Sequence, residues 1–279
     1  MLVGGGPAPQ GPRPYAIFED ATTLQVRRGH VVLKELPTRG FGRRVETKRQ
    51  AYTLARACCM TTPWAAGSVT NDFGIDPAKV HVVGIGGNIE AHPVEREWWP
   101  PRFLFIGVAF EHKNGPAAVR ALGRLRREIP EAQLDVVGRH PPIDEPGVHG
   151  HGVQPLRDPL AQARVRSLLE QATCFVLPSV FDASPIACVD AATAGIPSIA
   201  TSAGGAAFLV GDAGRICDSH DEDALLAAMR ELSDPDTARA LGAKAHERSR
   251  LFTWDAVAQR ILRSLDLPGV DDTGLADFL

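Results

Sequence analysis

The chain has 279 residues, 44% hydrophobic and 23% charged, which is typical of a globular protein that buries a core and is long enough for two domains. Its 30 basic and 33 acidic residues give a net charge of −3, so no overall positive field is present to hold nucleic acid or an anionic membrane. No apolar run approaches the roughly 20 residues that span a bilayer, and the five cysteines show no CxxC pair. We therefore expect a cytoplasmic protein with reduced thiols and no transmembrane segment.

The first third of the chain predicts few regular elements. Residues 1–14 are rich in glycine and proline and are expected to be disordered. The elements predicted next are a strand at 15–18, a helix at about 43–56, a helix at 64–73 that ends at Gly74, and a strand at 80–83. Residues 88–101 hold several prolines and two tryptophans without clean periodicity, so we interpret them as an interdomain linker.

From Arg102 onwards, short apolar runs alternate regularly with helical patterns. The predicted strands lie at 103–106, 133–137, 174–177, 197–200 and 214–217, and the predicted helices at 115–128, 160–171, 186–194, 221–232 and 236–248. This alternation indicates a parallel sheet covered by helices on both faces, with ligands at the carboxyl ends of the strands. We expect a first domain at 15–98, a complete second domain at 99–250 built on this parallel sheet, a helix at 251–266 and a tail at 267–279.

The segment after the first strand of this second part places a glycine and a lysine where a helix begins. It reads Gly107-Val108-Ala109-Phe110-Glu111-His112-Lys113-Asn114-Gly115. A lysine here can reach a phosphate lying on the helix N-terminus, where free N–H groups and the helix dipole favour anions. By itself, the pattern is more typical of a surface lysine beside a glycine-rich turn.

Two carboxylates, Asp182 and Asp190, lie eight positions apart around another helix start. Ser184 is the expected N-cap of that helix, with Pro185 at its first position. The N–H groups expected to face the same side belong to Ser184, Ile186 and Ala187. Capping alone explains Asp182 and Ser184, and a helix-surface charge explains Asp190. The coincidence with the lysine segment favours a ligand site instead.

As an ensemble, these features resemble the donor domain of the family 4 glycosyltransferases, over roughly Arg102 to Arg250. The similar segments are the Gly107…Lys113-x-Gly115 loop, Val136-Val137-Gly138, Gly150-His151-Gly152-Val153, Pro178-Ser179, the paired acids, Ala194-Gly195-Ile196-Pro197, Gly204-Gly205 and Phe252-Thr253-Trp254. That family has the GT-B fold, in which two Rossmann-like domains hold the donor mainly on the second. Residues 15–92 resemble only the end of the family's acceptor domain, so the resemblance implies that the domain at 15–98 is partial and lacks much of the family's acceptor domain. It also implies that the helix at 251–266 crosses back to this first domain.

The resemblance implies a retaining glycosyltransferase that moves a hexose-type sugar from a nucleoside-diphosphate sugar to an acceptor, without a metal or other cofactor. Lys113 would bind the diphosphate, Asp182 would contact the donor sugar, and both are expected to be catalytic. Asp190 would hold the ribose hydroxyls. The further donor-binding residues that the resemblance implies are Gly107, Gly138, Gly152, Val153, Ser184, Pro185, Ile186 and Ala187. Among them, Gly138 and the Gly152-Val153 segment would approach the base. The acceptor, whether a sugar, a lipid or a small molecule, is not identified.

Three positions depart from the family pattern. The family has glutamates where this chain has Asp182 and Asp190, and an arginine where it has Val108. Less reach and less charge at the diphosphate weaken the main catalytic device. A non-catalytic nucleotide-sugar-binding fragment or partner subunit is therefore the alternative, and a nucleotide-sugar epimerase is a third.

Other patterns carry less weight. Gly84-Ile85-Gly86-Gly87 follows a strand, but the third glycine of a dinucleotide motif is missing and no helix pattern follows. Acidic pairs at Asp221 and Asp234 are typical of helix caps, and His149 and His151 have no third ligand nearby. We expect neither an NAD site nor a metal site.

Overall fold

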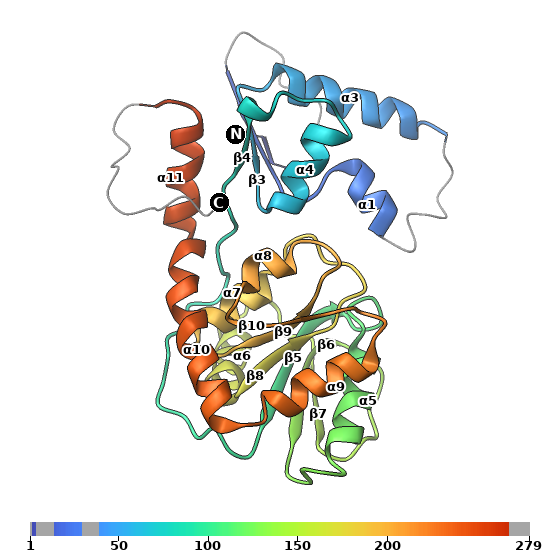
Figure 1. Ribbon diagram of the computed structural model, residues 1–279, viewed down its shortest axis with the longest axis vertical. Helices are drawn as coiled ribbons and strands as arrows, with labels where there is room; N and C mark the ends of the chain where they lie inside the picture. Colours follow the sequence, from blue (N-terminus) through green and yellow to red (C-terminus); the bar gives the residue numbers. More distant parts are fainter. Residues whose placement is uncertain (1, 4–13, 30–38, 268–279) are drawn as a thin grey trace. The chain divides into compact units, whose positions relative to one another are not determined.

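The computed structural model describes residues 2–3, 14–29 and 39–267, and Figure 1 shows the fold coloured along the chain. The chain forms two compact units. Unit 1 comprises Met1–Gly86 together with Leu251–Leu279, and unit 2 comprises Gly87–Arg250. The chain therefore passes from unit 1 into unit 2 once and returns once. The first passage lies between Gly86 and Gly87, whereas the sequence pattern predicted it near residue 98.

Unit 2 is built on a parallel sheet in the order β10-β9-β8-β5-β6-β7. Its strands are β5 (Arg102–Ala109), β6 (Gln133–Arg139), β7 (Val148–Gly152), β8 (Cys174–Leu177), β9 (Ser198–Thr201) and β10 (Gly214–Cys217). Every residue of β8 and β9 is buried, as expected for central strands with helices on both faces. The strand order reverses between β5 and β8, which is where ligands bind in sheets of this type.

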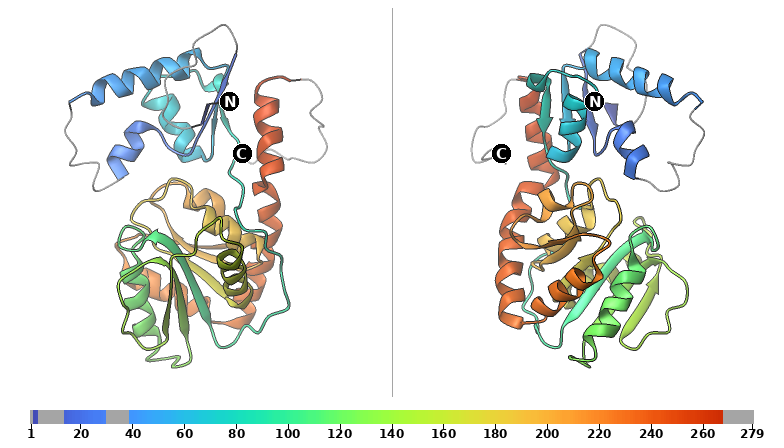
Figure 2. Two further views of the ribbon diagram at one scale, coloured as in Figure 1. Left: turned by 180° about the vertical axis from the view of Figure 1, so that it is seen from behind. Right: turned by 45° about the vertical axis from the view of Figure 1, so that its right-hand side comes forward.

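Helices cover both faces of this sheet. They are α5 (Gly115–Leu125), α6 (Pro159–Gln171), α7 (Ile186–Thr193), α8 (Ala206–Val210), α9 (Glu222–Glu231) and α10 (Pro235–Ser249). Right-handed crossovers on the two sides of the reversal place α5 and α7 on opposite faces, where α9 packs against α5 and α10 against α7 (Figure 2). Asp221 and Asp234 cap α9 and α10 by accepting backbone N–H bonds, which confirms the capping interpretation.

The segment that opens unit 2, residues 87–101, has no regular secondary structure but is fastened to its helices. The guanidinium of Arg96 donates to the carbonyl oxygens of Leu169 at 3.1 Å, Ala172 at 2.6 Å and Ala194 at 2.5 Å. These carbonyls lie at the C-termini of α6 and α7, where a cation also opposes the helix dipole favourably. This anchoring explains why the segment belongs to unit 2.

Two bulges interrupt the sheet at the carboxyl ends of β5 and β7. On β5, Ile106 pairs with Val137 and Ala109 with Arg139, so two β5 residues face one on β6. On β7, the register shifts at His151. Bulges re-aim side chains and are common beside functional sites. Because both lie next to the end of β6, they reshape the edge at which ligands are expected.

Unit 1 has a smaller parallel sheet in the order β1-β2-β3-β4. Its strands are β1 (Leu2–Val3), β2 (Ala16–Glu19), β3 (Ala57–Met60) and β4 (Val80–Val82), and its helices are α1 (Thr23–Gly29), α3 (Phe41–Leu54), α4 (Pro63–Asn71) and α11 (Trp254–Ser264). The single-turn helices are η1 (Pro77–Lys79) and, at the junction of the units, η2 (Arg250–Phe252). Disorder was expected at 1–14, and most of this segment lies outside the described residues. Leu2 and Val3, which are described, form a strand. The expected tail at 267–279 likewise lies outside the described residues, apart from Leu267.

Two apolar layers hold unit 1 together. On one face, Tyr52 and Phe73 make an edge-to-face contact at 5.1 Å between ring centroids, inside a cluster formed with α3 and α4. On the other face, Val257 and Ile261 of α11 pack against β2, β3 and Val83. A helix from the far end of the sequence therefore covers one side of this sheet.

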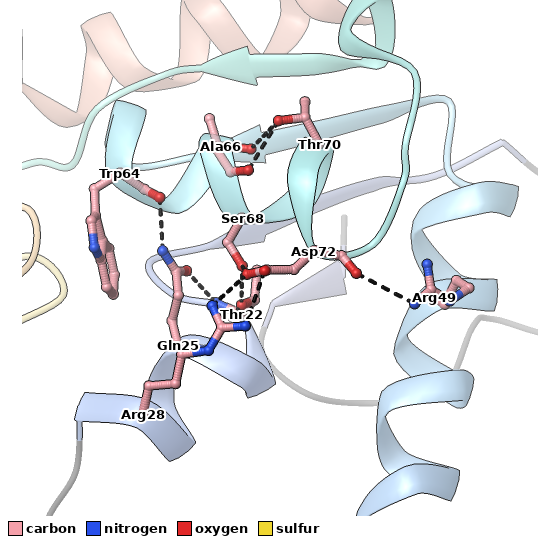
Figure 3. Close-up of polar contacts among 10 residues, drawn as sticks. Thr22, Gln25, Arg28, Arg49, Trp64, Ala66, Ser68, Thr70 and Asp72 are labelled. Atoms are coloured by element: carbon pink, nitrogen blue, oxygen red, sulfur yellow. Dashed lines mark hydrogen bonds and ion pairs between the residues drawn. The ribbon is translucent and has the colours of Figure 1, made fainter.

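A network of polar side chains fixes α1 against α4, as Figure 3 shows. Thr22 and Gln25 form a reciprocal capping box, because Thr22 N donates to the Gln25 Oε1 and Gln25 N donates to the Thr22 Oγ1. Thr22 also contacts the hydroxyl of Ser68 at 2.7 Å, and Ser68 donates to Asp72 at 2.6 Å. Arg28 closes the network with a bidentate ion pair to Asp72. This network gives α1 a fixed position on unit 1.

Two elements of unit 2 differ from the sequence-based expectation. Residues 148–152, expected to be a loop, form the edge strand β7. Their sequence, Val-His-Gly-His-Gly, contains only one apolar side chain larger than glycine. An edge strand that buries few side chains does not require apolar residues, so no strand pattern was visible. The short helix α8 follows the Gly204-Gly205 loop, where only a loop was expected. Five residues are too few to show a helical period.

Candidate functional site

The loop between β5 and α5 is shaped by two glycines that lie under larger side chains. A Cβ on Gly107 would stand 3.1 Å from the Cγ of Lys113, and one on Gly115 would stand 2.1 Å from the ring of Phe110. Asn114 adopts the left-handed conformation, with φ of 55°. Its side-chain amide donates to a backbone carbonyl of the loop after β10, at 2.9 Å. The loop is thus held from both sides, and its lysine projects over Gly107.

The loop after β8 is paired with the loop after β9. Asp182 N donates to the Ala203 carbonyl at 3.1 Å, and Gly205 N donates to the Asp182 carbonyl at 3.0 Å. These bonds make an isolated parallel bridge between Asp182 and Gly204. Gly204 has φ of 117°, and a Cβ there would lie 1.9 Å from the Asp182 carbonyl oxygen. The Gly204-Gly205 pair therefore serves to fix the backbone that carries Asp182.

These two loops bring the two residues expected to be catalytic into direct contact. Lys113 Nζ donates to Asp182 Oδ2 at 2.5 Å. The lysine side chain is 23% exposed and the aspartate side chain 14% exposed, so both can be approached from solvent. A charge-assisted bond of this kind is stronger than a neutral one. It joins the ends of β5 and β8, the two strands at the reversal of the sheet.

The start of α7 differs from the expected cap. Pro185 occupies the cap position, and no side chain caps the helix. The Ser184 hydroxyl donates to the neighbouring Ala183 carbonyl instead, because a proline at the cap directs the chain differently. In the described part of the chain, the N–H groups of Ile186 and Ala187 have no acceptor, as is usual in the first turn of a helix. Such groups are suited to an anion.

Asp190 lies one turn further along α7 and is not a surface charge. It is only 4% exposed, and its Oδ1 accepts from the backbone N–H groups of Asn88 at 2.7 Å and Ile89 at 3.0 Å. Gly87 is needed beside it, because a Cβ there would stand 2.8 Å from the same oxygen. Burial raises the pKa of Asp190 to about 6, against the lowering effect of the two N–H donors. The Oδ1 atom of Asp190 thus has a structural role, because it holds the backbone of Asn88 and Ile89 against α7.

The buried thiol of Cys188, on α7, is affected by the charges of all three groups. Burial is the main cause of the raised pKa of Cys188. The negative charges of Asp182 and Asp190 raise it further, while Lys113 and a hydrogen bond with Ser198 oppose them. All three charged side chains are therefore close enough to act on one sulfur atom of α7. Lys113 and Asp182 meet directly, and Asp190 belongs to the same part of unit 2.

The remaining residues predicted for the site lie on the ends of β6 and β7. Gly138 has φ of 132°, and a Cβ there would stand 1.9 Å from the carbonyl oxygen of Gly107, so it permits a close approach of two loops. Gly152 has φ of 63° and follows the β7 bulge. The side chain of Val153 is 51% exposed, and that of Val108 on the β5 bulge is 69% exposed. Two apolar side chains, one on the β5 bulge and one directly after β7, are thus exposed at this edge of the sheet.

Sequence reasoning missed three contributors to the site. The Gly204-Gly205 loop was recognised only as a similarity, not as the clamp on Asp182. The backbone of Asn88 and Ile89 reaches Asp190 across about a hundred positions, and no local signal indicates such a contact. His140, whose ring packs on β7, stood in a loop with no recognisable pattern. Of these three contributors, only the first had a signal in the sequence: the glycine pair at 204 and 205 indicates a place where two backbone segments approach closely.

Replacing Gly204 by alanine is expected to destabilise unit 2 by about 2–4 kcal/mol, because the new Cβ would collide with the Asp182 carbonyl and the backbone is left-handed. Thermal unfolding measures the effect. Gly42→Ala is the matched control: this glycine lies in helix α3 with open space around its Cβ position, so no loss is expected. Equal melting temperatures for Gly204→Ala and the wild type would contradict the clamp.

No cluster of three or more His, Cys, Asp or Glu side chains suited to a metal ion occurs among the described residues. Nor does any helix in the described ranges have the length and apolar character needed to cross a membrane.

The fold matches solved glycosyltransferase structures over most of the chain. Sucrose-phosphate synthase from Thermosynechococcus elongatus aligns with a TM-score of 0.72 at 20% identity, covering 91% of this chain and 67% of that one. WaaG, a glycosyltransferase involved in lipopolysaccharide biosynthesis, aligns with a TM-score of 0.69 at 19% identity, covering 96% and 77%. The chain has the fold of the GT-B glycosyltransferases, with two units that each contain a parallel sheet.

Within that class, residues 100–234 match the family described as Glycosyl transferases group 1, and this stretch is a domain of that family. The match begins just before β5 and includes Lys113, Asp182 and Asp190. The expectation of a glycosyltransferase domain in the second part of the chain is confirmed.

Curated relatives are glycosyltransferases as well. D-inositol 3-phosphate glycosyltransferase of a Nocardioides species is 26% identical over 252 residues, covering 78% of this chain and 55% of the relative. Glycogen synthase of Mycobacterium tuberculosis is 29% identical over 211 residues, covering 68% and 49%. MMP alpha-(1->4)-mannosyltransferase of Mycolicibacterium hassiacum is 26% identical over 238 residues, covering 81% and 57%. The chain spans about half the length of these relatives.

Proposed function

We propose that unit 2 binds a nucleoside-diphosphate sugar and that the chain acts in retaining transfer of a hexose-type sugar from this donor to an acceptor, without a metal. The observation that carries the proposal is the Lys113–Asp182 contact at the reversal of the sheet. A basic and an acidic side chain on neighbouring loops, beside a helix start with open N–H groups, match the needs of a diphosphate that carries a sugar.

The ion pair suggests how donor binding proceeds. Without donor, the Lys113 ammonium is neutralised by Asp182 at 2.5 Å. A diphosphate carries more negative charge than one carboxylate and competes for the lysine, which leaves Asp182 free to accept hydrogen bonds from sugar hydroxyls. As the bond between sugar and diphosphate breaks, charge accumulates on the diphosphate. Lys113 and the N–H groups of Ile186 and Ala187 would stabilise that charge.

Asp190 would have two tasks. Its Oδ1 holds Asn88 and Ile89, so the ribose hydroxyls of the donor are left to Oδ2. The raised pKa of Asp190, about 6, supports a functional role. A buried carboxylate that is costly to ionise is retained most often where its charge is used. The proposed ribose contact therefore explains why this position is charged at neutral pH.

Nucleoside diphosphates are expected to raise the melting temperature of the protein without added metal. At a ligand concentration about 100 times the Kd, the stabilisation is about 2.7 kcal/mol, enough for a shift of several degrees. UDP, GDP and ADP are titrated separately in a thermal-shift assay, with EDTA or with magnesium. A flat response to all three in both conditions would reject the donor site. A shift that depends on magnesium would reject only the metal-free part of the proposal.

Transfer itself needs a second measurement. Incubation with nucleotide sugars, followed by detection of released nucleoside diphosphate, reports donor hydrolysis or transfer. Binding without any release would favour a non-catalytic donor-binding partner over an enzyme. The acceptor is proposed only as a hydroxyl-bearing molecule, whether a sugar, a lipid or a small molecule.

We also propose that the protein works in the cytoplasm. Its five cysteines are all buried free thiols, and Cys58 and Cys59 are adjacent in β3 without a disulfide. Unpaired cysteines of this kind are typical of a reducing compartment such as the cytoplasm.

A further inference from the structure

The end of β7 is arranged around the side chain of His140, which follows β6. A Cβ on Gly150 would stand 2.3 Å from the Cε1 of His140, so the imidazole lies directly on the glycine of the neighbouring strand. Its Nε2 lies 3.3 Å from the backbone N of Gly152, and its Nδ1 lies 2.8 Å from the Pro141 carbonyl oxygen. A carbonyl accepts only, so Nδ1 carries the hydrogen and Nε2 accepts from Gly152.

The same imidazole is connected to the lysine loop by a series of edge-to-face and tilted ring contacts. His140 lies 6.1 Å from Phe110, and Phe110 lies 5.7 Å from Phe105, between ring centroids. Phe110 in turn needs Gly115, the first residue of α5. Three rings therefore run along the carboxyl ends of β5 and β6 to β7. They join the loop that carries Lys113 to the segment that begins at Gly152.

The contact with Gly152 occurs where the strand is irregular. The register of β7 shifts at His151, and Gly152 takes a positive φ of 63° directly after it. A bulged segment with a left-handed glycine has few bonds of its own, so its position depends on what holds it from outside. His140 supplies such a bond and leaves the side chain of Val153 exposed at the ligand-binding edge.

We propose that His140 is the positioning residue for nucleobase discrimination, because it sets the place of the Gly152–Val153 segment against which the base of the donor lies. This inference rests on the proposed function, in which a nucleotide occupies the carboxyl edge of unit 2. His140 does not need to touch the base: its bond to Gly152 N and its ring on Gly150 fix the segment that does. The geometry distinguishes it from the diphosphate-binding residues, which every nucleotide uses alike.

The test is the ratio between the Kd values of the weakest and the tightest of ADP, GDP and UDP, measured by isothermal titration calorimetry. His140→Ala removes the ring, and Gly150→Ala keeps the histidine but displaces its ring. Both variants are expected to lower the ratio by about three- to tenfold, as the loss of one positioned hydrogen bond allows. A role in stability alone would weaken all three nucleotides equally and leave the ratio unchanged.

His149→Gln is the matched control, since His149 is an exposed histidine of the same strand, and its ratio should equal that of the wild type. If His140→Ala fails to fold, the result for Gly150→Ala decides the test. That variant is expected to fold, because the His140 ring can rotate away from the new Cβ. A ratio within twofold of the wild type in the folded variants overturns the proposal, as does a wild type that binds all three nucleotides equally. A wild type that binds none overturns the proposed function itself.

Discussion

Replacing Lys113 by alanine is expected to weaken the binding of a nucleoside diphosphate by about 10- to 100-fold, the loss of one or two charge-assisted hydrogen bonds. The effect is large because the lysine is the partner of Asp182 at 2.5 Å. Without the ammonium, that carboxylate stays unpaired and repels the incoming phosphates. Calorimetric titration of wild type and variant with the tightest-binding nucleotide measures the change.

Two further variants separate this role from general electrostatics. Lys244→Ala removes a lysine that is 57% exposed and paired with Asp212, so its nucleotide affinity should match that of the wild type. Asp182→Asn frees the Lys113 ammonium, and the affinity for inorganic pyrophosphate should therefore rise or stay equal. If Lys113→Ala binds as tightly as Lys244→Ala, the lysine does not contact the diphosphate.

Replacing Asp190 by asparagine is expected to stabilise the protein at pH 7.5 by about 1–3 kcal/mol and to weaken nucleotide binding. Burial raises the pKa of Asp190 to about 6, above the value of about 3.9 for an unfolded aspartate. Between these two values the folded state binds more protons than the unfolded state. The wild type therefore loses stability as pH rises from about 4 to 6, and asparagine removes this loss while its carbonyl oxygen can still accept from Asn88 and Ile89.

Melting curves of wild type and Asp190→Asn at pH 4.5 and 7.5 measure the effect, since the two proteins should differ little at the lower pH and clearly at the higher. Asp190→Ala should be less stable than the wild type at both, because the N–H groups of Asn88 and Ile89 lose their acceptor. If the melting temperatures of the wild type and Asp190→Asn change with pH in the same way, ionisation of the Asp190 carboxyl does not destabilise the folded protein.

The sheet of unit 2 could be predicted because its central strands are short, continuous apolar runs closed by glycine or proline. β8 was predicted with its bounds, Cys174–Leu177, since burial on both faces leaves no room for polar residues. β7 was not, because an edge strand is stabilised mainly by backbone bonds to β6 and needs few apolar side chains. The periodicity of a sequence reports burial, and residues 148–152 are scarcely buried.

The candidate site was predictable to a similar extent. The contact of Lys113 with Asp182 follows from placing both on loops at the carboxyl ends of β5 and β8. The cap at Ser184 failed, because the following Pro185 takes the cap position itself. The fastening of Asp190 to Asn88 and Ile89 depends on a segment without secondary structure, whose path is set by tertiary contacts such as those of Arg96. Propensity and spacing carry no information about such a path.

The helix α11 has a consequence for the biosynthesis of the protein. Its residues Val257 and Ile261 complete an apolar layer with Ala57, Cys59 and Val83, but they are translated after all of unit 2. Unit 2 is continuous in sequence and can fold as it emerges from the ribosome, whereas one apolar face of the sheet of unit 1 stays uncovered until α11 has been translated. The sheet of unit 1 is therefore completed only after unit 2 has been translated, and an apolar face left exposed during synthesis is prone to aggregation.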